Sequence, residues 1–340
     1  MPNLNVGSTK SNFVKLLKYA IVFNGYNLNN INGNFDDELS DVLIKFQEFT
    51  LLKQTGNADF QTWMSLLVST GDPGRRGTAS DGITEVTPAR AQTLIDNGYV
   101  IIGRYLTNVQ GSSLNKRIQP GELQTIFNSG LSVYPIFQEA HSGVNDFSYD
   151  VGYQDYQKAF IAAAEYGFPL GTTIYFAVDF DVLGHEISNS IIPHWTGLNA
   201  AKEALGNQYN IGIYGPRNAC IQVSDRGLAK YSFVSGMSSG FSGNLGYPLP
   251  SNWAFDQIST ITIGSGAGSI NIDNNINSQR DSGASELNYS VEIPEELPKN
   301  ENSDFFKQLN IITAAAEEYN KSVGSEEISD INYDLCSYYH

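Results

Sequence analysis

Apolar residues in the first 72 positions recur at the three- and four-residue spacing of amphipathic helices. The stretch Phe13–Val22 shows this spacing first, and Asp37–Phe49 resumes it after a region rich in glycine and asparagine. A third stretch, Phe60–Val68, follows the same rule. The pattern predicts a small three-helix bundle over residues 1–72. The turn-rich residues 73–79 are expected to form a linker to the next domain.

From residue 80 to residue 283 the pattern changes to short β-branched or aromatic runs that alternate with helical stretches. Such alternation is typical of an α/β domain with parallel strands and crossover helices. Eight runs favour a closed TIM-type (β/α) barrel over an open sheet. Glycines crowd a short loop between the last two runs, so the barrel is expected to be irregular at its last strands. The expected strands are Ser80–Gly82, Tyr99–Tyr105, Ser132–Phe137, Thr173–Val178, Ile211–Tyr214, Tyr231–Val234, Trp253–Ile258 and Ser269–Ile272.

Residues 284–340 differ in charge, with twelve acidic residues against three lysines. An amphipathic helix is predicted over Ser303–Lys321, and the rest reads as a flexible acidic C-terminal extension. Two interpretations stay open for this tail. It is either a solvated extension or a segment that docks to a protein partner or to the barrel.

Composition narrows the function classes. A net charge of −16 argues against a nucleic-acid partner, which is bound through clustered Lys and Arg, and is compatible with a neutral polysaccharide. No window is long and apolar enough to predict a membrane span. The first residues lack the basic and apolar regions of a signal peptide, so we expect synthesis in the cytoplasm and non-classical release, by phage-type lysis or dedicated export, if the protein acts at a cell wall. No cysteine or histidine spacing predicts a metal, and no cofactor is expected.

The strongest candidate for chemistry is the end of the fourth predicted strand. Side chains alternate along a strand, which places Asp179 and Asp181 on one face together with Ala177. In a TIM barrel this face points inward at the mouth where active sites form. Two nearby carboxylates with separated pKa values are what glycoside cleavage requires. The alternative is a pair of loop aspartates that cap the next helix or face water.

Polar or aromatic residues end the other predicted strands as well. Carboxylates, a guanidinium, an amide and aromatic rings at one mouth suit a sugar, whose hydroxyls accept and donate hydrogen bonds and whose apolar face stacks on Trp or Tyr. For two of these residues an alternative stays open, namely Arg104 as a structural ion-pair partner and Trp253 as a core residue. The strand-end residues are Asp81, Arg104, Tyr105, Gln138, Glu139, Tyr214, Gln257 and Asp273, and Trp253 of the seventh strand is grouped with them.

Several runs, taken in order, resemble a bacterial glycoside-hydrolase-like family, a TIM-type barrel distantly similar to the family 25 lysozymes (muramidases). The runs that carry the resemblance are Gly98–Leu106, Val133–Gln138, Ile174–Asp181, Ile211–Gly215 and Ile270–Asn275. The first segment resembles a peptidoglycan-binding-like three-helix domain through Gly33–Phe35, Val42–Gln47 and Thr55–Leu67. A purely structural bundle is the alternative for that segment.

The family 25 pattern implies an acidic residue after the first strand, Asp-x-Glu after the fourth and Asp near the eighth. Asp81, Asp179 with Asp181, and Asp273 stand at these positions. Asp181 replaces the catalytic Glu of the lysozymes and is one methylene shorter. This departure leaves open an acid out of reach, a changed stereochemical course, or a barrel that binds without cleaving. Glu139 is a candidate substitute acid.

These observations lead to the hypothesis of a muramidase-like glycoside hydrolase that acts on peptidoglycan or a related polysaccharide. Asp181 or Glu139 would act as the acid, while Asp179 and Asp81 would stabilise charge or position water. The remaining strand-end residues would bind the glycan. The alternative is a non-catalytic carbohydrate-binding protein on a degenerate glycosidase barrel. Phosphodiester cleavage is a third reading, disfavoured because no metal-ligand cluster is visible.

Overall fold

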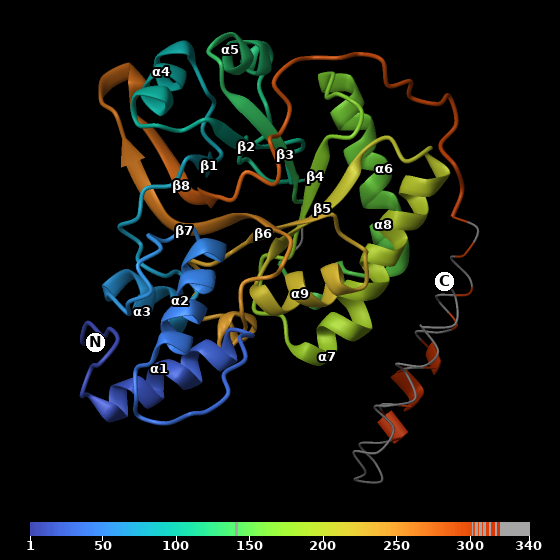
Figure 1. Cartoon of the computed structure of the whole chain (residues 1–340). Coiled ribbons are helices and arrows are strands. Elements are labelled where there is room, and N and C mark those ends of the chain that lie inside the picture. The colour runs from blue at the N-terminus through green and yellow to red at the C-terminus, as the bar shows by residue number, and fades with distance from the viewer. Residues whose placement is uncertain are drawn as a thin grey trace. The chain divides into compact units, whose positions relative to one another are not determined.

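Eight strands close into a barrel in the order in which they occur along the chain (Figure 1). The computed structural model describes residues 1–109, 111–139 and 142–300, together with residues 302, 305, 308, 311, 312, 314–316, 318 and 319. The prediction of an α/β chain with an eight-stranded closed barrel is confirmed. The strands are β1 (Ala79–Asp81), β2 (Ile101–Tyr105), β3 (Ser132–Phe137), β4 (Thr173–Ala177), β5 (Asn210–Gly215), β6 (Tyr231–Val234), β7 (Trp253–Ile263) and β8 (Ile270–Asn277).

The last strand runs against the others. Strands β1 to β7 pair in parallel with their neighbours, whereas β8 is antiparallel to both β7 and β1. Only residues 264–269 separate β7 from β8, and a crossover to a parallel strand needs a dozen residues or more. The chain therefore returns as a hairpin, which is the irregularity expected from the glycine-rich loop.

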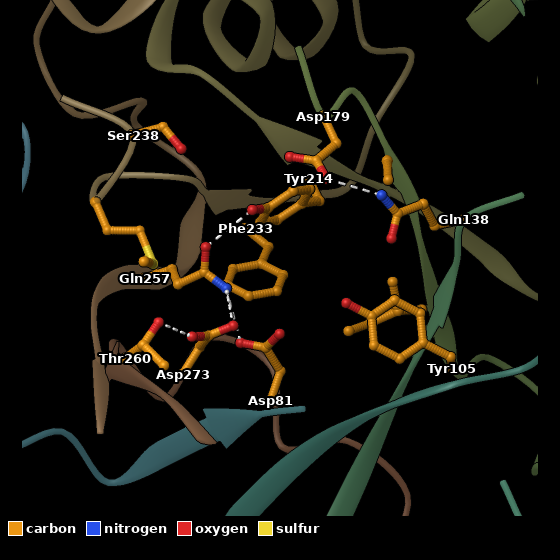
Figure 2. A pocket seen from close by; sticks show the side chains of 13 residues that line it. Asp81, Tyr105, Gln138, Asp179, Tyr214, Phe233, Ser238, Gln257, Thr260 and Asp273 are labelled. Atoms are coloured by element: carbon orange, nitrogen blue, oxygen red, sulfur yellow. Dashed lines mark hydrogen bonds between the residues drawn. The ribbon is translucent and has the colours of Figure 1, made fainter. Parts of the chain in front are cut away.

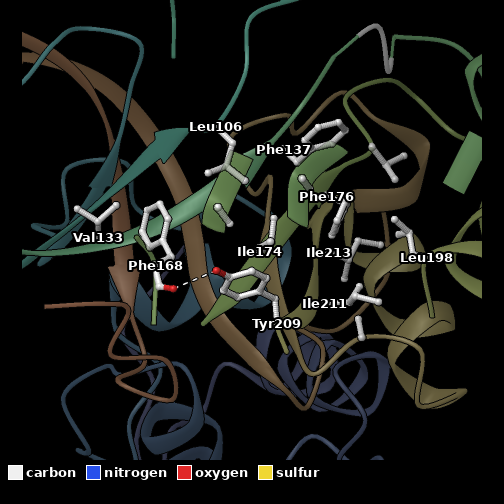
Figure 3. Close-up of a cluster of buried hydrophobic side chains, with 14 of the residues drawn as sticks. Leu106, Val133, Phe137, Phe168, Ile174, Phe176, Leu198, Tyr209, Ile211 and Ile213 are labelled. Carbon is white, nitrogen blue, oxygen red and sulfur yellow. Dashed lines mark hydrogen bonds between the residues drawn. The ribbon is translucent and has the colours of Figure 1, made fainter. Parts of the chain in front are cut away.

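Side chains alternate between the inside and the outside of the barrel. The inner cluster is aromatic, and Tyr134 stacks on Phe255 with 4.1 Å between ring centroids. Gly103 leaves room for the ring of Tyr134 on the next strand, because a Cβ at Gly103 would lie 2.5 Å from that ring. The larger outer cluster packs the strands against the surrounding helices (Figure 3). This packing supports the barrel mouth, where side chains from different strands meet.

Helices surround the barrel between successive strands. They are α4 (Pro88–Asp96), α5 (Glu122–Asn128), α6 (Tyr149–Tyr166), α7 (Gly184–Glu186), α8 (Ile192–Ala204) and α9 (Arg217–Asp225). The hydroxyls of Thr87 and Ser148 accept hydrogen bonds from backbone N–H groups at the starts of α4 and α6, as N-caps do. Four short helical turns complete these connections: η1 (Val144–Asp146), η2 (Ile187–Ile191, π-helical), η3 (Ser242–Asn244) and η4 (Gly266–Gly268). No helix in the described part of the chain combines the length and apolarity needed to cross a membrane.

Three helices precede the barrel: α1 (Ser11–Phe23), α2 (Asp37–Phe49) and α3 (Phe60–Leu67). They share an apolar core of their own, centred on Leu17, Leu43 and Trp63. The side chain of Gln47 ties the turn before α3 to α2, because its amide oxygen accepts hydrogen bonds from the backbone N–H groups of Thr55 and Gly56. The three helices predicted from apolar spacing are therefore present within one or two residues of the expected bounds.

The helices and the barrel share direct contacts. Phe49 at the end of α2 packs edge-on against Trp253 of β7, with ring centroids 6.3 Å apart. Arg75 donates hydrogen bonds to the carbonyls of Thr50 and Leu51 at the end of α2. Residues 1–296 accordingly form one compact unit, and residues 297–340 belong to a second. The domain boundaries expected at residues 72, 79 and 283 stay a prediction.

The first residues of the acidic tail contact the barrel, which agrees with the docking interpretation for this part of the tail. Ala284 pairs with Val133 through two backbone hydrogen bonds of 2.8 Å, and Val291 is buried in the outer cluster. Of the predicted helix over Ser303–Lys321, the described positions between 305 and 319 are helical. The remaining positions of that stretch, and residues 320–340, lie outside the described residues.

Candidate active site at the barrel mouth

A cavity of about 240 Å³ opens where the parallel strands end (Figure 2). The carboxyl ends of parallel strands in a closed barrel meet at one rim, which brings side chains from β1 to β7 together. Asp273 of the antiparallel strand β8 joins them because it pairs with Asp81 of β1. Seven of the lining residues were predicted from the strand ends: Asp81, Tyr105, Gln138, Asp179, Tyr214, Gln257 and Asp273. The others are Ile136, Ala177, Phe233, Met237, Ser238 and Thr260.

Asp81 and Asp273 form a facing pair in the wall of this cavity. Their Cα atoms are register partners in the antiparallel pairing of β1 with β8. Asp81 is only 2% exposed, and burial, followed by the charge of Asp273, raises its pKa to about 8. Burial and the charge of Asp179 raise the pKa of Asp273. The pair therefore retains a proton near neutral pH, because two neighbouring buried carboxylates do not both ionise easily.

Amide groups orient this pair. The Gln257 Nε2 atom donates hydrogen bonds to Asp81 Oδ1 (3.0 Å) and to Asp273 Oδ2 (3.2 Å). The Tyr214 hydroxyl donates to Gln257 Oε1 at 2.8 Å, which fixes the direction of the amide. Asn275 Nδ2 donates a further bond of 2.9 Å to Asp81 Oδ1, and Thr260 donates to Asp273. These donors favour a defined position for each carboxyl group before any ligand arrives.

Asp179 lies across the cavity from the pair (Figure 2). Its Oδ2 atom accepts a 2.9 Å hydrogen bond from Gln138 Nε2, and Gln138 Oε1 in turn accepts from Lys116 Nζ at 3.2 Å. Lys116 is 5% exposed and lies over the ring of Tyr105, with 4.5 Å from Nζ to the centroid. Burial lowers the pKa of Lys116 to about 8. The lysine thus orients the amide that holds Asp179.

The structure corrects the placement of Asp181. Strand β4 ends at Ala177, and the chain bends at Phe180, so the alternation that carries Asp179 into the cavity does not continue. Asp181 Oδ1 instead accepts hydrogen bonds from the backbone N–H (2.6 Å) and the hydroxyl (2.7 Å) of Ser242. It holds the start of η3 and does not line the cavity.

Three other predicted site residues also lie outside the cavity lining. Glu139 forms an ion pair with Lys158, with 3.0 Å between Oε2 and Nζ. Arg104 is fully buried, and its Nε atom lies 2.7 Å from Oε1 of Glu122 in α5. Arg104 is thus a structural ion-pair partner, which was the alternative left open for this residue. Trp253 has no exposed surface and packs in the outer cluster, so it is a core residue and not a sugar platform.

The sequence pattern missed Lys116, Thr260, Ser238 and Met237. Thr260 lies in β7 beyond the predicted strand end, and the other three come from loops with no periodic signal. Lys116 reaches the mouth because its neighbour Arg117 pairs with Tyr105 beside β2. Among the described residues, no group of three or more His, Cys, Asp or Glu side chains is arranged to hold a metal ion.

Comparisons with known proteins agree with this architecture. The family model described as "Rv2525c-like, glycoside hydrolase-like domain" matches residues 92–277, and the one described as "FadG/YbfG, PGDB-like domain" matches residues 3–67. The Tat-secreted protein Rv2525c of Mycobacterium tuberculosis, solved in complex with HEPES, is 22% identical with a TM-score of 0.51. That likeness covers 62% of this chain and 99% of the solved chain, and it supports the fold alone.

Two curated relatives come from Bacillus subtilis (strain 168). The uncharacterized protein FadG is 52% identical over 94% of this chain, and the uncharacterized protein YbfG is 46% identical over 84%. The chain spans about half the length of these relatives, 54% of the first and 41% of the second. Because the glycoside hydrolase-like model covers more than half of the residues, the chain belongs to the Rv2525c-like, glycoside hydrolase-like family.

Proposed function

We propose that the barrel hydrolyses glycosidic bonds in a bacterial cell-wall polysaccharide, in the manner of a muramidase. The observation that carries this proposal is the convergence of Asp81, Asp179 and Asp273 on one cavity, where burial raises the pKa of two of them. Glycoside cleavage uses one protonated carboxyl group and one carboxylate on either side of the scissile bond. The opposed positions of Asp179 and the Asp81–Asp273 pair match that requirement (Figure 2).

The roles follow from exposure and hydrogen bonding. Asp273 is the more exposed member of the pair, so it donates a proton to the leaving glycosidic oxygen, while Asp81, whose pKa burial raises to about 8, lies buried beside it. Asp179, held by Gln138, either removes a proton from the attacking water or attacks the anomeric carbon itself. In the first case the carbon–oxygen bond to the leaving group breaks as the bond to water oxygen forms. In the second case the same bond breaks as Asp179 bonds to the anomeric carbon, and water then hydrolyses the bond between the sugar and Asp179.

The remaining lining suits a sugar ring. Tyr105 and Tyr214 offer aromatic surface, with Phe233 buried behind them, while Gln138 and Gln257 offer amide groups. A volume of about 240 Å³ is below the roughly 300–1,000 Å³ of pockets for drug-sized ligands, so the cavity fits one sugar unit of a longer chain. The resemblance to family 25 lysozymes favours a peptidoglycan strand, and the PGDB-like helices are proposed to bind the same polymer.

One observation favours a second candidate, a non-catalytic glycan-binding protein. Asp181 stands where the lysozymes carry their catalytic Glu, and its carboxylate is bound to Ser242 outside the cavity. A barrel that has lost this acid would keep the amide and aromatic groups that bind sugar. The two candidates differ in turnover and not in binding.

The test is to incubate the purified chain with peptidoglycan and to measure new reducing ends by mass spectrometry. Hydrolysis predicts release by the wild type and loss of release in Asp179→Asn. Asp225→Asn is the matched control, because Asp225 is exposed at the end of α9 and does not line the cavity. Binding to several wall types without any release would contradict the enzymatic proposal and support the binding protein.

A further inference from the structure

The loop after β6 supplies one wall of the cavity through Met237 and Ser238. This loop covers residues 235–252, and η3 is its only helical turn. The Met237 N–H donates to the Gln257 carbonyl at 2.6 Å, next to the side chain that orients both carboxylates. Connections of this length without much secondary structure are uncommon in compact domains and often carry function. The position of Met237 and Ser238 therefore depends on what holds the start of the loop.

Two hydroxyls from the segment after α3 hold that start. Ser69 Oγ and Thr70 Oγ1 both donate to the carbonyl oxygen of Gly236, at 2.7 Å and 3.0 Å. Because a carbonyl oxygen has two lone pairs, these bonds use its full accepting capacity. The Ser69 carbonyl accepts a 3.1 Å bond from Arg217 of α9, so the segment is itself anchored to the barrel. Ser69 is buried, which shields its bond from water.

Close packing leaves Gly236 little freedom. A Cβ on Gly236 would collide with the Asp256 carboxylate and lie 2.9 Å from the Ser69 carbonyl. The peptide that carries the Gly236 carbonyl is thus enclosed between the segment after α3 and strand β7. Met237 and Ser238 follow this peptide directly, so their position in the cavity wall depends on the segment after α3, which lies outside the barrel.

We propose that Ser69 and Thr70 are positioning residues, which hold Met237 and Ser238 in the cavity wall and thereby determine the affinity of the barrel for its glycan. The glycan part of this inference rests on the proposed function. The N-terminal region then completes the barrel site, in addition to any polymer that its own helices bind. Neither Ser69 nor Thr70 touches the cavity, and both act through Gly236.

The test uses the full chain with Ser69→Ala and Thr70→Val combined. Losing both bonds is expected to speed amide hydrogen exchange at Met237 and Ser238 about thirtyfold, since each bond contributes on the order of 1 kcal/mol and about 1.4 kcal/mol corresponds to a factor of ten. KM for the glycan is expected to rise about tenfold while kcat changes less than about threefold. The single variant Thr70→Ser keeps both hydroxyl donors and should therefore behave like the wild type. Ser40→Ala is the matched control, because it removes a 3.1 Å hydroxyl bond to a glycine carbonyl within the helical bundle.

Unchanged exchange at Met237 and Ser238 in the double variant would overturn the inference, as would faster exchange with an unchanged KM. If the double variant does not fold, Thr70→Val alone decides, because Thr70 is half-buried and Ser69 keeps its bond. If the wild type shows no turnover, the dissociation constant for N-acetylglucosamine oligomers replaces KM. A wild type that neither cleaves nor binds them contradicts the proposed function, whereas the exchange rates still decide whether the two hydroxyls hold the loop.

Discussion

Two regions of the protein bury a carboxyl group with a raised pKa, and their surroundings differ. At the mouth, Asp81 and Asp273 face a cavity of about 240 Å³ and receive hydrogen bonds from amides. Between the helices and the barrel, Asp256 lines a cavity of about 20 Å³, which has room for one water molecule. Burial raises the pKa of Asp256 to about 7, although Arg217 and Arg75 act in the opposite direction.

The comparison teaches that a raised pKa does not by itself identify a catalytic group. Asp256 and Gln257 are adjacent in β7, yet one side chain faces the bundle and the other the mouth. Only the mouth combines a carboxyl group of raised pKa with a second aspartate across a cavity of about 240 Å³. The enclosed region instead joins two parts of the fold.

The largest expected effect separates the two regions by activity. Asp273→Asn removes the proposed acid and should lower kcat/KM for peptidoglycan by about 10²–10⁴. The loss of kcat/KM in Asp256→Asn should be smaller than the loss in Asp273→Asn by a factor of at least about 100, because Asp256 does not line the cavity. Reducing-end release measures both. Equal losses of kcat/KM in the two variants would contradict the distinction between the mouth and the region around Asp256.

A second prediction concerns stability in the barrel frame. Arg104→Met leaves the carboxylate of Glu122 buried without its partner, so we expect the free energy of unfolding to fall by about 3–5 kcal/mol. Urea denaturation followed by circular dichroism measures this loss. The folded variant should keep most of its affinity for the glycan. A loss of binding without a loss of stability would instead indicate that Arg104 contributes to the binding site.

A third prediction is the pH dependence of stability. The folded pKa of Asp81 lies above its unfolded value near 4, so between these values the folded state binds the additional proton. The free energy of unfolding should therefore fall as pH rises from about 4 to about 8, by up to about 1.4 kcal/mol per pH unit for each such group. Asp81→Asn should flatten this slope up to about pH 8, and Asp256→Asn up to about pH 7. Parallel slopes in wild type and variants would contradict the assignment.

The smallest effect is expected at Asp181. Asp181→Asn weakens two hydrogen bonds to Ser242 and should cost about 1–2 kcal/mol of stability. Its effect on kcat should stay below about tenfold, much less than that of Asp179→Asn. A loss at Asp181 as large as at Asp179 would show that η3 and its loop rearrange to bring Asp181 into the mouth.

Much of the fold could be predicted because apolar periodicity records which face of each element is buried. Alternation along β4 carried Asp179 to the cavity correctly. It failed at Asp181, since a bend after the strand depends on tertiary contacts. Neighbouring side chains on a strand point to opposite faces, so Arg104 and Tyr105 of β2 cannot both line the mouth if the strand is regular. The prediction that both belong to the site was therefore inconsistent with the strand that it assumed.

The position of Trp253 shows a different limit. Regular alternation would put Trp253 on the same face of β7 as Gln257. The pairing of β6 with β7 shifts register between Ser232 and Phe233, and such a bulge re-aims the side chains before it. No residue type in the sequence signals that shift. Lys116 was equally hidden, because it reaches Gln138 through a loop and not through a periodic element.

The antiparallel return of β8 makes the acidity of the site a matter of strand register. Asp81 faces Asp273 because of the register in which β8 pairs with β1. A slip of one residue turns every side chain of a strand to the other face, so the same strand paired one residue out of register would direct Asp273 outward and leave Asp81 without its charged neighbour. Backbone pairing that touches no ligand thus sets the pH at which the mouth holds a proton.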